Sequence, residues 1–422
     1  ISMLKSVLIK SCTVIDPNSS FNQQVVDILI ENGVISKIGK EIAFDGEVFD
    51  AKGKFIAPGF FDLNVSIGEP GLETKEDFST ASKAAIAGGF TGLGLMPHNQ
   101  PTTDSKSQVE FLVNKAKGNL VDIYPYGTVS QERAGKDLAE MFDMQNSGAI
   151  AFTDGDKPIQ DAGLMERALL YAKGFDALIF SYAEDAAIAG KSKMNEGVMS
   201  TLLGMKGIPN LAEDLMIVRD LYLAEYTDSK VHFSTISTAK AVDLIRDAKQ
   251  KGLKVTCDVS AHHLVLTEDA LSDFDTNYKV KPPLRTQKDV DALLEGVKTG
   301  VIDAIVSQHK PQEIELKQVE FEIANYGIIG LQTVLSLLLK ANLSLDLIVE
   351  KLAIKPREIL GLQIPKIEEQ QLANLIVFDK SQWYYQKENN FSKSFNSPFI
   401  NSTLNGKVWL TCNNSQINIS NH

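Results

Sequence analysis

The chain has 422 residues, of which 44% are hydrophobic and 23% are charged, and its formal net charge is −12. This length exceeds a single small core and suits one large α/β domain with a minor one, because single cores stop growing near ~250–300 residues. The 42 Lys and Arg residues form no dense basic stripe against 54 Asp and Glu, and no apolar run approaches the ~20 residues that cross a bilayer. We therefore expect neither a nucleic-acid partner nor a membrane association.

Cysteine usage and the start of the chain bear on the cellular compartment. Cys12, Cys257 and Cys412 lie far apart and form no Cys-x-x-Cys pair, so neither a disulfide framework nor a thiolate zinc site is indicated. The first residues, Ile1-Ser2-Met3-Leu4-Lys5, lack the charged head and the apolar run of a signal peptide. We expect a cytoplasmic protein.

Both ends of the chain carry short strand signals. Asn32-Gly33 supplies the positive φ angles of a tight hairpin between two β-branched runs. The predicted terminal strands are Leu4–Lys10, Val25–Glu31, Val34–Ile38, Ala373–Asp379 and Gly406–Thr411. We expect residues 1–55 and 363–422 to join in one small β-sandwich.

Between the two ends, an apolar strand followed by an amphipathic helix is repeated. The predicted strands are Phe60–Ser66, Phe90–Leu95, Val121–Tyr126, Ala149–Thr153, Ala177–Ser181, Val231–Thr235, Lys254–Val259 and Asp303–Ser307. Apolar residues three and four apart predict helices at Phe78–Ala87, Asp161–Ala172, Ala239–Lys251 and Lys288–Lys298. Eight alternations predict a (β/α)₈ barrel over residues 56–362, although a doubly wound open sheet shows the same local pattern.

The stretch that opens the predicted barrel carries a family resemblance. It reads Ile56-Ala57-Pro58-Gly59-Phe60-Phe61-Asp62-Leu63-Asn64-Val65-Ser66-Ile67-Gly68-Glu69-Pro70-Gly71. Further matching segments are Asn195-Glu196-Gly197, Val280–Arg285, Gly327–Thr333 and Ser392–Phe399. Along nearly its whole length the chain resembles the metal-dependent amidohydrolases, and most closely the dihydroorotases. The resemblance implies a TIM barrel with a β-sandwich, and cyclic-amide hydrolysis in pyrimidine biosynthesis with two zinc ions.

The resemblance also implies where zinc ligands stand in the family: a His-x-His after the first strand, a carboxylate after the fourth, one His each after the fifth and sixth, and an Asp after the eighth. In this sequence those positions hold Asn64, Ser66, Asp154, Ser181, Thr235 and Gln308. Amides and hydroxyls are poor zinc ligands, and one aspartate cannot hold the ion. Without zinc, the attacking water keeps a pKa near ~15.7 instead of ~7. We expect no zinc, no metal site and no catalytic residue.

Positions that bind substrate in the family have changed as well. Gly68 stands where the family has an Arg, and His98 and Lys281 each stand where it has an Asn. Our candidates for ligand binding are Gly68, His98, His263, Lys281 and His309. His309, in the former catalytic loop, fits a binding role and a structural role equally, and His232 fits a hydrogen-bonded core residue.

Three pairs of residues have open interpretations. His262 and His263 are adjacent at a predicted strand end, where neighbouring side chains point apart, so a joint metal site is disfavoured. Asp154 and Asp156 lie in a Thr-Asp-Gly-Asp turn, where aspartates usually bond backbone amides, so we favour this structural role over acid and base roles. Either of the two could match the family carboxylate. Finally, Lys281 and Lys310 could anchor an acidic ligand or form salt bridges in the space of two lost dications; we favour the salt bridges.

The sequence keeps the motifs that specify the family's fold but lacks its metal ligands. It therefore predicts a dihydroorotase-like pseudoenzyme that acts as a structural or regulatory partner. Two alternatives stay open: an active cyclic-amide hydrolase with a rebuilt or metal-free site, and a small-molecule sensor that uses the barrel mouth. Because a partner can stabilise a folded protein by mass action, we expect a twofold homodimer. The family resemblance further implies aspartate carbamoyltransferase as a possible companion.

Overall fold

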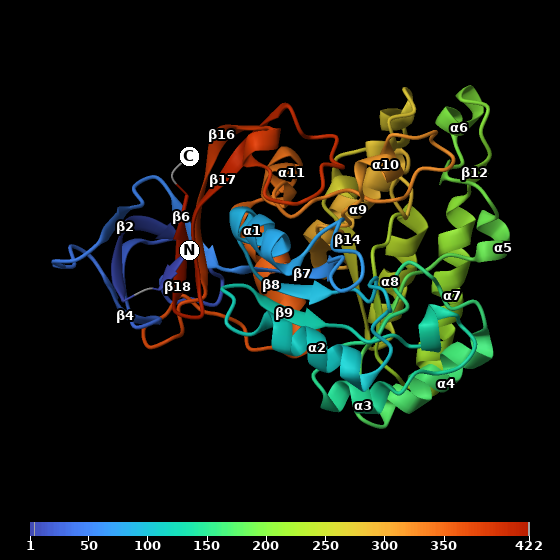
Figure 1. Cartoon of the computed structure of the whole chain (residues 1–422), viewed down its shortest axis with the longest axis horizontal. Coiled ribbons are helices and arrows are strands. Elements are labelled where there is room, and N and C mark those ends of the chain that lie inside the picture. The colour runs from blue at the N-terminus through green and yellow to red at the C-terminus, as the bar shows by residue number, and fades with distance from the viewer. Residues whose placement is uncertain (4, 421–422) are drawn as a thin grey trace.

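The computed structural model describes residues 1–3 and 5–420; of the predicted strand Leu4–Lys10, Leu4 lies outside the described residues. Figure 1 shows a β-rich part at one end of the molecule and a larger barrel with peripheral helices at the other. Among the described residues, no helix is long and apolar enough to cross a membrane.

Parallel strands form the barrel and bring their carboxyl ends to one mouth. They are β7 (Phe60–Val65), β8 (Phe90–Leu95), β9 (Asp122–Pro125), β10 (Ile179–Ser181), β13 (Val231–Phe233), β14 (Val255–Ser260) and β15 (Ala304–Val306). Bridges from Phe152 to Gly127 and to Ile179 join the two sheets on one side. On the other side, a bridge between Val65 and His309 closes the barrel. The closed barrel confirms the prediction over the open doubly wound sheet.

The predicted fourth strand, Ala149–Thr153, is irregular. Only Phe152 makes bridges to its neighbours there, and it lies between Gly127 and Ile179. Directly after Thr153, the Asp154 carboxylate binds backbone amides of the preceding loop and turns the chain away from the sheet. Backbone hydrogen bonds still fill the fourth position of the barrel, because Ile150, Ala151 and Thr153 bond to Pro125 and Gly127 on one side and Phe152 bonds to Leu178 and Phe180 on the other.

Helices cover the outside of the barrel and begin at recognisable caps. Helix α1 (Phe78–Gly88) starts at Asp77, whose side chain accepts from Thr80 N, and ends at Gly89 with φ 84°. In the same way Asp161 caps α4 (Ala162–Lys173). The other longer helices are α2 (Lys106–Ala116), α3 (Met141–Asn146), α7 (Asn210–Thr227), α8 (Ala239–Gln250), α9 (Gln287–Thr299), α11 (Val334–Lys340) and α13 (Lys355–Leu360). Short helices are α5 (Ala186–Ala189), α6 (Val198–Leu202), α10 (Ile314–Lys317) and α12 (Leu345–Val349).

Strands from both ends of the chain form one sheet of the β-sandwich, at the left in Figure 1. They are β1 (Ser2–Met3), β2 (Ser6–Val14), β3 (Val25–Glu31), β4 (Val34–Gly39), β5 (Val48–Asp50), β6 (Phe55–Pro58), β16 (Leu375–Tyr385), β17 (Ser402–Asn413) and β18 (Gln416–Ile419). As predicted, Asn32 and Gly33 have positive φ in the hairpin between β3 and β4. Strand β6 pairs antiparallel with β16, so the two termini are joined by backbone hydrogen bonds. The exact boundaries at residues 55/56 and 362/363 stay a prediction.

Gly59 connects the two parts of the fold. It follows β6 in the sandwich and precedes β7 in the barrel. A Cβ atom at this position would lie 2.1 Å from Thr91 Oγ1 and 2.5 Å from Asn374 Oδ1, which is closer than atoms can approach. The chain can pass between the two layers here only because glycine has no side chain.

Candidate functional site at the barrel mouth

A small cavity lies at the carboxyl ends of the barrel strands. Its volume is about 30 Å³, on a scale where one water needs roughly 10–15 Å³. The residues predicted from sequence that line it are Asn64, Ser66, His98, Thr235, Lys281 and Gln308. The sequence-predicted positions therefore do converge on the mouth, but the space left among them suits a few waters.

The hydroxyl groups at three of the former ligand positions have partners within the protein. Ser181 Oγ donates to Asp220 Oδ2 over 2.5 Å, away from the mouth cavity. Thr235 Oγ1 donates to Asp258 Oδ1 over 3.0 Å. Ser66 Oγ lies 2.7 Å from His98 Nδ1. Each hydroxyl is thus part of the internal hydrogen-bond network of the barrel.

The two amides at the mouth are arranged in the same way. Asn64 Nδ2 lies 3.5 Å from Ser234 Oγ, a long hydrogen bond. Gln308 Nε2 donates to the carbonyl of Lys281 over 2.7 Å. The Gln308 Oε1 atom is buried and has no hydrogen-bond partner in the described structure. A neutral amide therefore stands where the family has a carboxylate.

Asp154, the acid retained after the fourth strand, accepts hydrogen bonds from backbone amides. Its Oδ1 accepts from the amides of Val129 and Ser130, each over 2.9 Å, and its Oδ2 accepts from Ser130 Oγ. Burial raises the pKa of this carboxyl, while the bonds from Ser130 and Val129 oppose the rise. The geometry agrees with the turn interpretation of the Thr-Asp-Gly-Asp sequence for Asp154. For the second aspartate, Asp156, that interpretation was wrong, because its side chain forms ion pairs and not backbone bonds.

Gly155 is the residue of this turn that faces the cavity. A Cβ built on Gly155 would lie 2.2 Å from His98 Nε2, and its φ of 64° also favours glycine. The His98 ring therefore occupies the space into which a side chain at position 155 would point.

Asp156 is the centre of an ion cluster at the mouth. Its carboxylate forms salt bridges with Lys310 and with Arg133. Burial acts to raise the pKa of Asp156, but the attraction of Lys310, with Arg133, holds that pKa well below its usual range. Asp156 is therefore a carboxylate near neutral pH, and its charge is neutralised by two cations.

His98 lies beside this cluster as a neutral ring. Burial lowers its pKa well below the ordinary value, and the positive charges of Arg133 and Lys310 add to this effect despite Asp156. The amide of Asp156 donates to His98 Nε2 over 3.4 Å, which assigns the ring proton to Nδ1. His98 Nδ1 then donates to Ser66 Oγ.

Lys281 makes a further salt bridge at the mouth. Its Nζ lies 3.4 Å from Glu184 Oε1 and donates to the backbone carbonyl of Asp156 over 3.1 Å. The same ammonium stands 5.5 Å from the centre of the Tyr182 ring. Both lysines that we considered as anchors for an acidic ligand thus have carboxylate partners within the chain.

Three of the five ligand-binding candidates do not line the cavity. A Cβ on Gly68 would lie 2.0 Å from the Leu72 carbonyl oxygen, so this tight loop has no room for a side chain. His263 is buried, with Nδ1 2.5 Å from Ser260 Oγ and Nε2 2.9 Å from the Pro282 carbonyl oxygen. His309 is also buried and faces away from the cavity.

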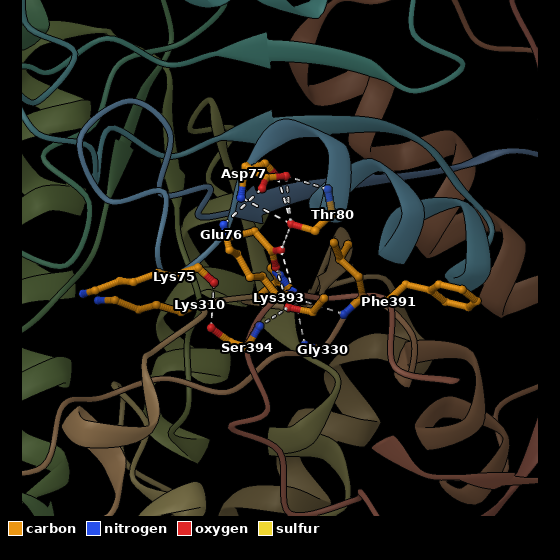
Figure 2. Close-up of polar contacts among 12 residues, drawn as sticks. Lys75, Glu76, Asp77, Thr80, Lys310, Gly330, Phe391, Lys393 and Ser394 are labelled. Atoms are coloured by element: carbon orange, nitrogen blue, oxygen red, sulfur yellow. Dashed lines mark hydrogen bonds and ion pairs between the residues drawn. The ribbon is translucent and has the colours of Figure 1, made fainter. Parts of the chain in front are cut away.

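The side chain of His309 belongs to a polar clasp around Glu76. His309 Nε2 donates to Glu76 Oε2 over 3.0 Å, and its Nδ1 accepts from Gly330 N over 3.1 Å. Glu76 also accepts from Ser392 Oγ over 2.5 Å and from Lys393 N over 2.9 Å. Figure 2 shows how these contacts bring the segment around Lys393 against the start of α1. The structure gives His309 a structural position.

The expectation that His262 and His263 point apart was wrong. Strand β14 ends at Ser260, and His262–Leu264 form a 3₁₀ turn in which strand alternation no longer holds. The two rings lie against each other, with centroids 4.8 Å apart and planes tilted by 37°. His232 behaves as predicted for a core residue, since its Nδ1 lies 2.8 Å from Thr256 Oγ1 and its Nε2 lies 2.7 Å from Asp258 Oδ2.

The donor set does not fit a pair of zinc ions. The former ligand positions at the mouth present neutral amides and hydroxyls, and the ammonium groups of Lys281 and Lys310 stand beside them. Zinc selects imidazole, thiolate and carboxylate ligands, and a nearby cation repels it. Within residues 1–3 and 5–420, no three His, Cys, Asp or Glu side chains cluster in a way that could hold a metal.

Sequence reasoning missed several residues of this site. Arg133 comes from the loop after the third strand, and nothing in its local sequence marks it as a partner of Asp156. Glu184 follows the fifth strand closely enough to have been considered, because barrel sites use the residues just after each strand. Glu76 lies outside any quoted motif.

The parallel barrel with its mouth site and composite β-sandwich defines an amidohydrolase-type fold. Solved structures agree: an L-hydantoinase (dihydropyrimidinase) from Arthrobacter aurescens superposes with a TM-score of 0.83 at 24% identity, covering 98% of this chain and 96% of its own. A D-hydantoinase gives 0.81 at 21% identity, covering 98% and 95%. At these identities the likeness establishes the fold.

Sequence relatives place the chain more narrowly. A family model described as Dihydro-orotase-like matches residues 53–241. The dihydroorotase of Acetivibrio thermocellus is 40% identical over 97% of this chain and 98% of its own length. That of Geotalea daltonii is 42% identical over 96% and 97%. This chain belongs to the dihydroorotase family, whose members take part in pyrimidine biosynthesis.

Proposed function

We propose that this protein is a dihydroorotase homologue that has lost metal-dependent hydrolysis and acts as a structural or regulatory partner in pyrimidine biosynthesis. One observation carries the proposal: Lys310 and Arg133 both form salt bridges with Asp156 at the mouth where the family holds zinc. Protein cations there supply the positive charge that a carboxylate would otherwise receive from a metal.

The surrounding residues support the same conclusion. Metal-dependent hydrolysis needs a polarised carbonyl and a water whose pKa has been lowered. At the mouth, Asn64 and Thr235 offer neutral atoms, and the cavity has a volume of about 30 Å³. Drug-sized ligand pockets are roughly ten times larger or more. The same small volume weighs against a small-molecule sensor that uses this mouth.

The test is a joint measurement of metal content and turnover. Protein purified without chelators is expected to hold less than about 0.1 zinc per chain and to neither hydrolyse dihydroorotate nor cyclise carbamoyl aspartate above background. The Acetivibrio thermocellus dihydroorotase, 40% identical, is the positive control in both assays. Near-stoichiometric zinc, or turnover that tracks added zinc, would overturn the proposal.

The regulatory role requires a partner, and we propose aspartate carbamoyltransferase from the same organism, with the present chain acting as a folded companion. Binding to the folded form would stabilise it by mass action even without catalysis. Mixing the two purified proteins and measuring mass by light scattering tests this. A complex of defined stoichiometry supports the pairing, and independent elution at about 50 µM of each protein contradicts it.

A metal-free hydrolase is the second candidate, because Ser66, His98 and Asp156 lie in line at the cavity. Ser66 Oγ is 2.7 Å from His98 Nδ1, and His98 Nε2 is 3.7 Å from Asp156 Oδ1. A serine nucleophile needs a histidine nitrogen that can accept its proton. Here the Asp156 amide donates to Nε2, which leaves the proton on Nδ1 facing Ser66. The arrangement therefore weighs against an activated serine.

A fluorophosphonate probe distinguishes the two candidates. The first candidate predicts no covalent labelling of the protein. Labelling that is lost in Ser66→Ala, and retained in a control variant of a buried serine outside the mouth, Ser200→Ala, would favour the metal-free hydrolase.

A further inference from the structure

A groove lies where the β-sandwich meets two helices of the barrel. Helices α1 and α11 form one wall, and strands β16 and β17 form the other; Figure 1 shows α1 and α11 beside these two strands. The volume of the groove is about 720 Å³. Ligand pockets have volumes of roughly 300–1,000 Å³. This groove can therefore hold a small molecule, whereas the barrel mouth, at about 30 Å³, has room only for waters.

Both tryptophans of the chain line this groove. Trp383 lies on β16, where its Nε1 donates to Ser336 Oγ over 3.4 Å and its ring centroid lies 5.3 Å from that of Tyr385. These two contacts hold the Trp383 ring in one orientation. Tyr384 and Phe391, each about half exposed, also line the groove. The groove therefore offers aromatic surface on which a flat ring can stack.

The charged side chains that line the groove are cations. They are Lys83 on α1 and Lys407 on β17, and no carboxylate side chain of the described residues lies among them. Lys407 Nζ stands 3.8 Å from the centre of the Trp409 ring. Asp379, opposite Lys407 on β16, forms no salt bridge with it, because the Asp379 carboxylate accepts from Ser381. In a chain with a net charge of −12, this local positive charge favours an anion.

The wall of the groove also has more hydrogen-bond donors than acceptors. Trp409 Nε1 is buried and has no acceptor in the described structure. The side-chain amides of Gln382 and Asn418 have no hydrogen-bond partner within residues 1–3 and 5–420. Gln332, in contrast, is occupied, because its Oε1 accepts from Phe391 N over 2.8 Å. An indole N–H and two free amides beside two ammonium groups suit a ligand that is rich in acceptor oxygens.

We propose that this groove binds a nucleoside monophosphate, with the base on Trp383 and the phosphate against Lys407. The two residues have the right separation. Trp383 lies opposite Leu404, and Lys407 follows Leu404 by three residues, or about 10 Å along β17. A nucleotide covers such a span from its base to its phosphate. The ribose hydroxyls then face the free amides, and Lys83 adds to the attraction for the phosphate.

A nucleotide explains both features of the groove at once. An inorganic anion would use the lysines and leave the aromatic surface empty, whereas a neutral aromatic molecule would leave the two ammonium groups without a partner. Stacking on an aromatic side chain is open to every base, because each base has a flat face. We therefore use both a pyrimidine and a purine nucleotide as probes. The site lies outside the barrel mouth and does not depend on whether the mouth hydrolyses a substrate.

Tryptophan fluorescence of the full chain tests the proposal directly, because Trp383 and Trp409 are its two tryptophans and both line the groove. Uridine or adenosine 5′-monophosphate is expected to change the emission with a Kd below about 1 mM. Uridine, which lacks the phosphate, and ribose 5-phosphate, which lacks the base, should each bind at least about tenfold more weakly than the nucleotide. Binding of neither nucleotide, or equal binding of ribose 5-phosphate, would overturn the proposal.

Substitutions in the groove test the placement of the ligand, with calorimetry as the measurement because it does not depend on tryptophan. Lys407→Met and Trp383→Leu should each weaken nucleotide binding at least about tenfold. Lys10→Met, at an exposed position on β2 outside the groove, makes the same change of charge and should leave the Kd unchanged.

Thermal unfolding of each variant shows whether its fold is intact. If Lys407→Met or Trp383→Leu does not fold, Lys83→Met decides the test, because Lys83 is exposed on α1 and makes no ion pair in the described part of the chain. We expect it to weaken binding about threefold. A Kd that is unchanged in the folded groove variants, or that rises equally in Lys10→Met, would overturn the proposal.

Discussion

Lys310 and Asp156 form a salt bridge across the barrel mouth, joining the loop after the eighth strand to the turn after the fourth. Arg133 binds the same carboxylate from a third loop. The pair is about a quarter to a third exposed, so solvent screens it only in part. An ion cluster at the former metal site therefore also joins three loops of the barrel and is expected to stabilise the fold.

Removing the carboxylate should destabilise the protein. We expect Asp156→Asn to lower the free energy of unfolding by about 1–2 kcal/mol, because Lys310 and Arg133 would be left close together without their partner. The matched control is Asp176→Asn, which breaks an ion pair with Lys230 in which the aspartate is 93% exposed, with an expected change below about 0.5 kcal/mol. Urea unfolding of both variants checks the difference. Equal changes in the free energy of unfolding would mean that the ion cluster at the mouth stabilises the fold no more than an exposed ion pair does.

Restoring part of the zinc site should not restore zinc binding. We expect Asn64→His with Ser66→His to stay below about 0.1 zinc per chain, because Ser181, Thr235 and Gln308 still lack ligand atoms and Lys310 still repels a dication. Elemental analysis after dialysis against zinc is the measurement. Zinc near one per chain in this variant would show that the mouth tolerates a metal.

Asp62 should make stability depend on pH. Burial raises its pKa to about 7, against the bonds from Ser307 and Asn64. Between the unfolded pKa, roughly 4, and the folded pKa of about 7, the folded state keeps a proton that the unfolded state has released. The contribution of this group to stability is therefore present at low pH and is lost as the pH rises across that window.

The measurement is urea unfolding at four pH values from 4.5 to 7.5. In wild type the free energy of unfolding should fall as the pH rises across this window, and Asp62→Asn should reduce that slope by up to about 1.4 kcal/mol per pH unit. Asp45→Asn, at an exposed position, should leave the slope unchanged. If wild type and Asp62→Asn ran parallel across the window, Asp62 would not carry the proton.

The Glu76 clasp should hold the segment around Lys393 in place. Glu76→Gln replaces one of the two acceptor oxygens by an NH₂ group, which cannot accept a hydrogen bond, so at least one of the donors Ser392, His309 and Lys393 loses its acceptor. We expect amide hydrogen exchange of Lys393 to become about tenfold faster, which corresponds to about 1.4 kcal/mol of local stability. Glu388→Gln, exposed in the same region, is the control. Unchanged protection in Glu76→Gln would place the anchor of this segment elsewhere.

Local patterns in the sequence determined most of the frame. The Asn32-Gly33 hairpin, the helices that begin near Phe78 and Asp161, and seven of the eight barrel strands follow from turn chemistry and hydrophobic periodicity, which act over a few residues. The exception was the strand around Phe152, which makes only isolated bridges and irregular backbone hydrogen bonds to its neighbours. The replaced ligand positions were likewise readable one residue at a time.

Only the tertiary structure decided what replaced the reactive groups. Asp156 meets Lys310 from 154 positions away and Arg133 from 23, and no local pattern reports such pairings. His309 was equally compatible with a binding and a structural role until its ring was seen against Glu76. In the same way, α7 was predictable as a helix, but its apolar residues lie all around it, so periodicity could not show which face is exposed. Glu213 and Asp220 accept hydrogen bonds from Ser237 before α8 and from Ser181 at the end of β10, and these bonds fix that rotation, because a buried carboxylate must find donors wherever the fold supplies them.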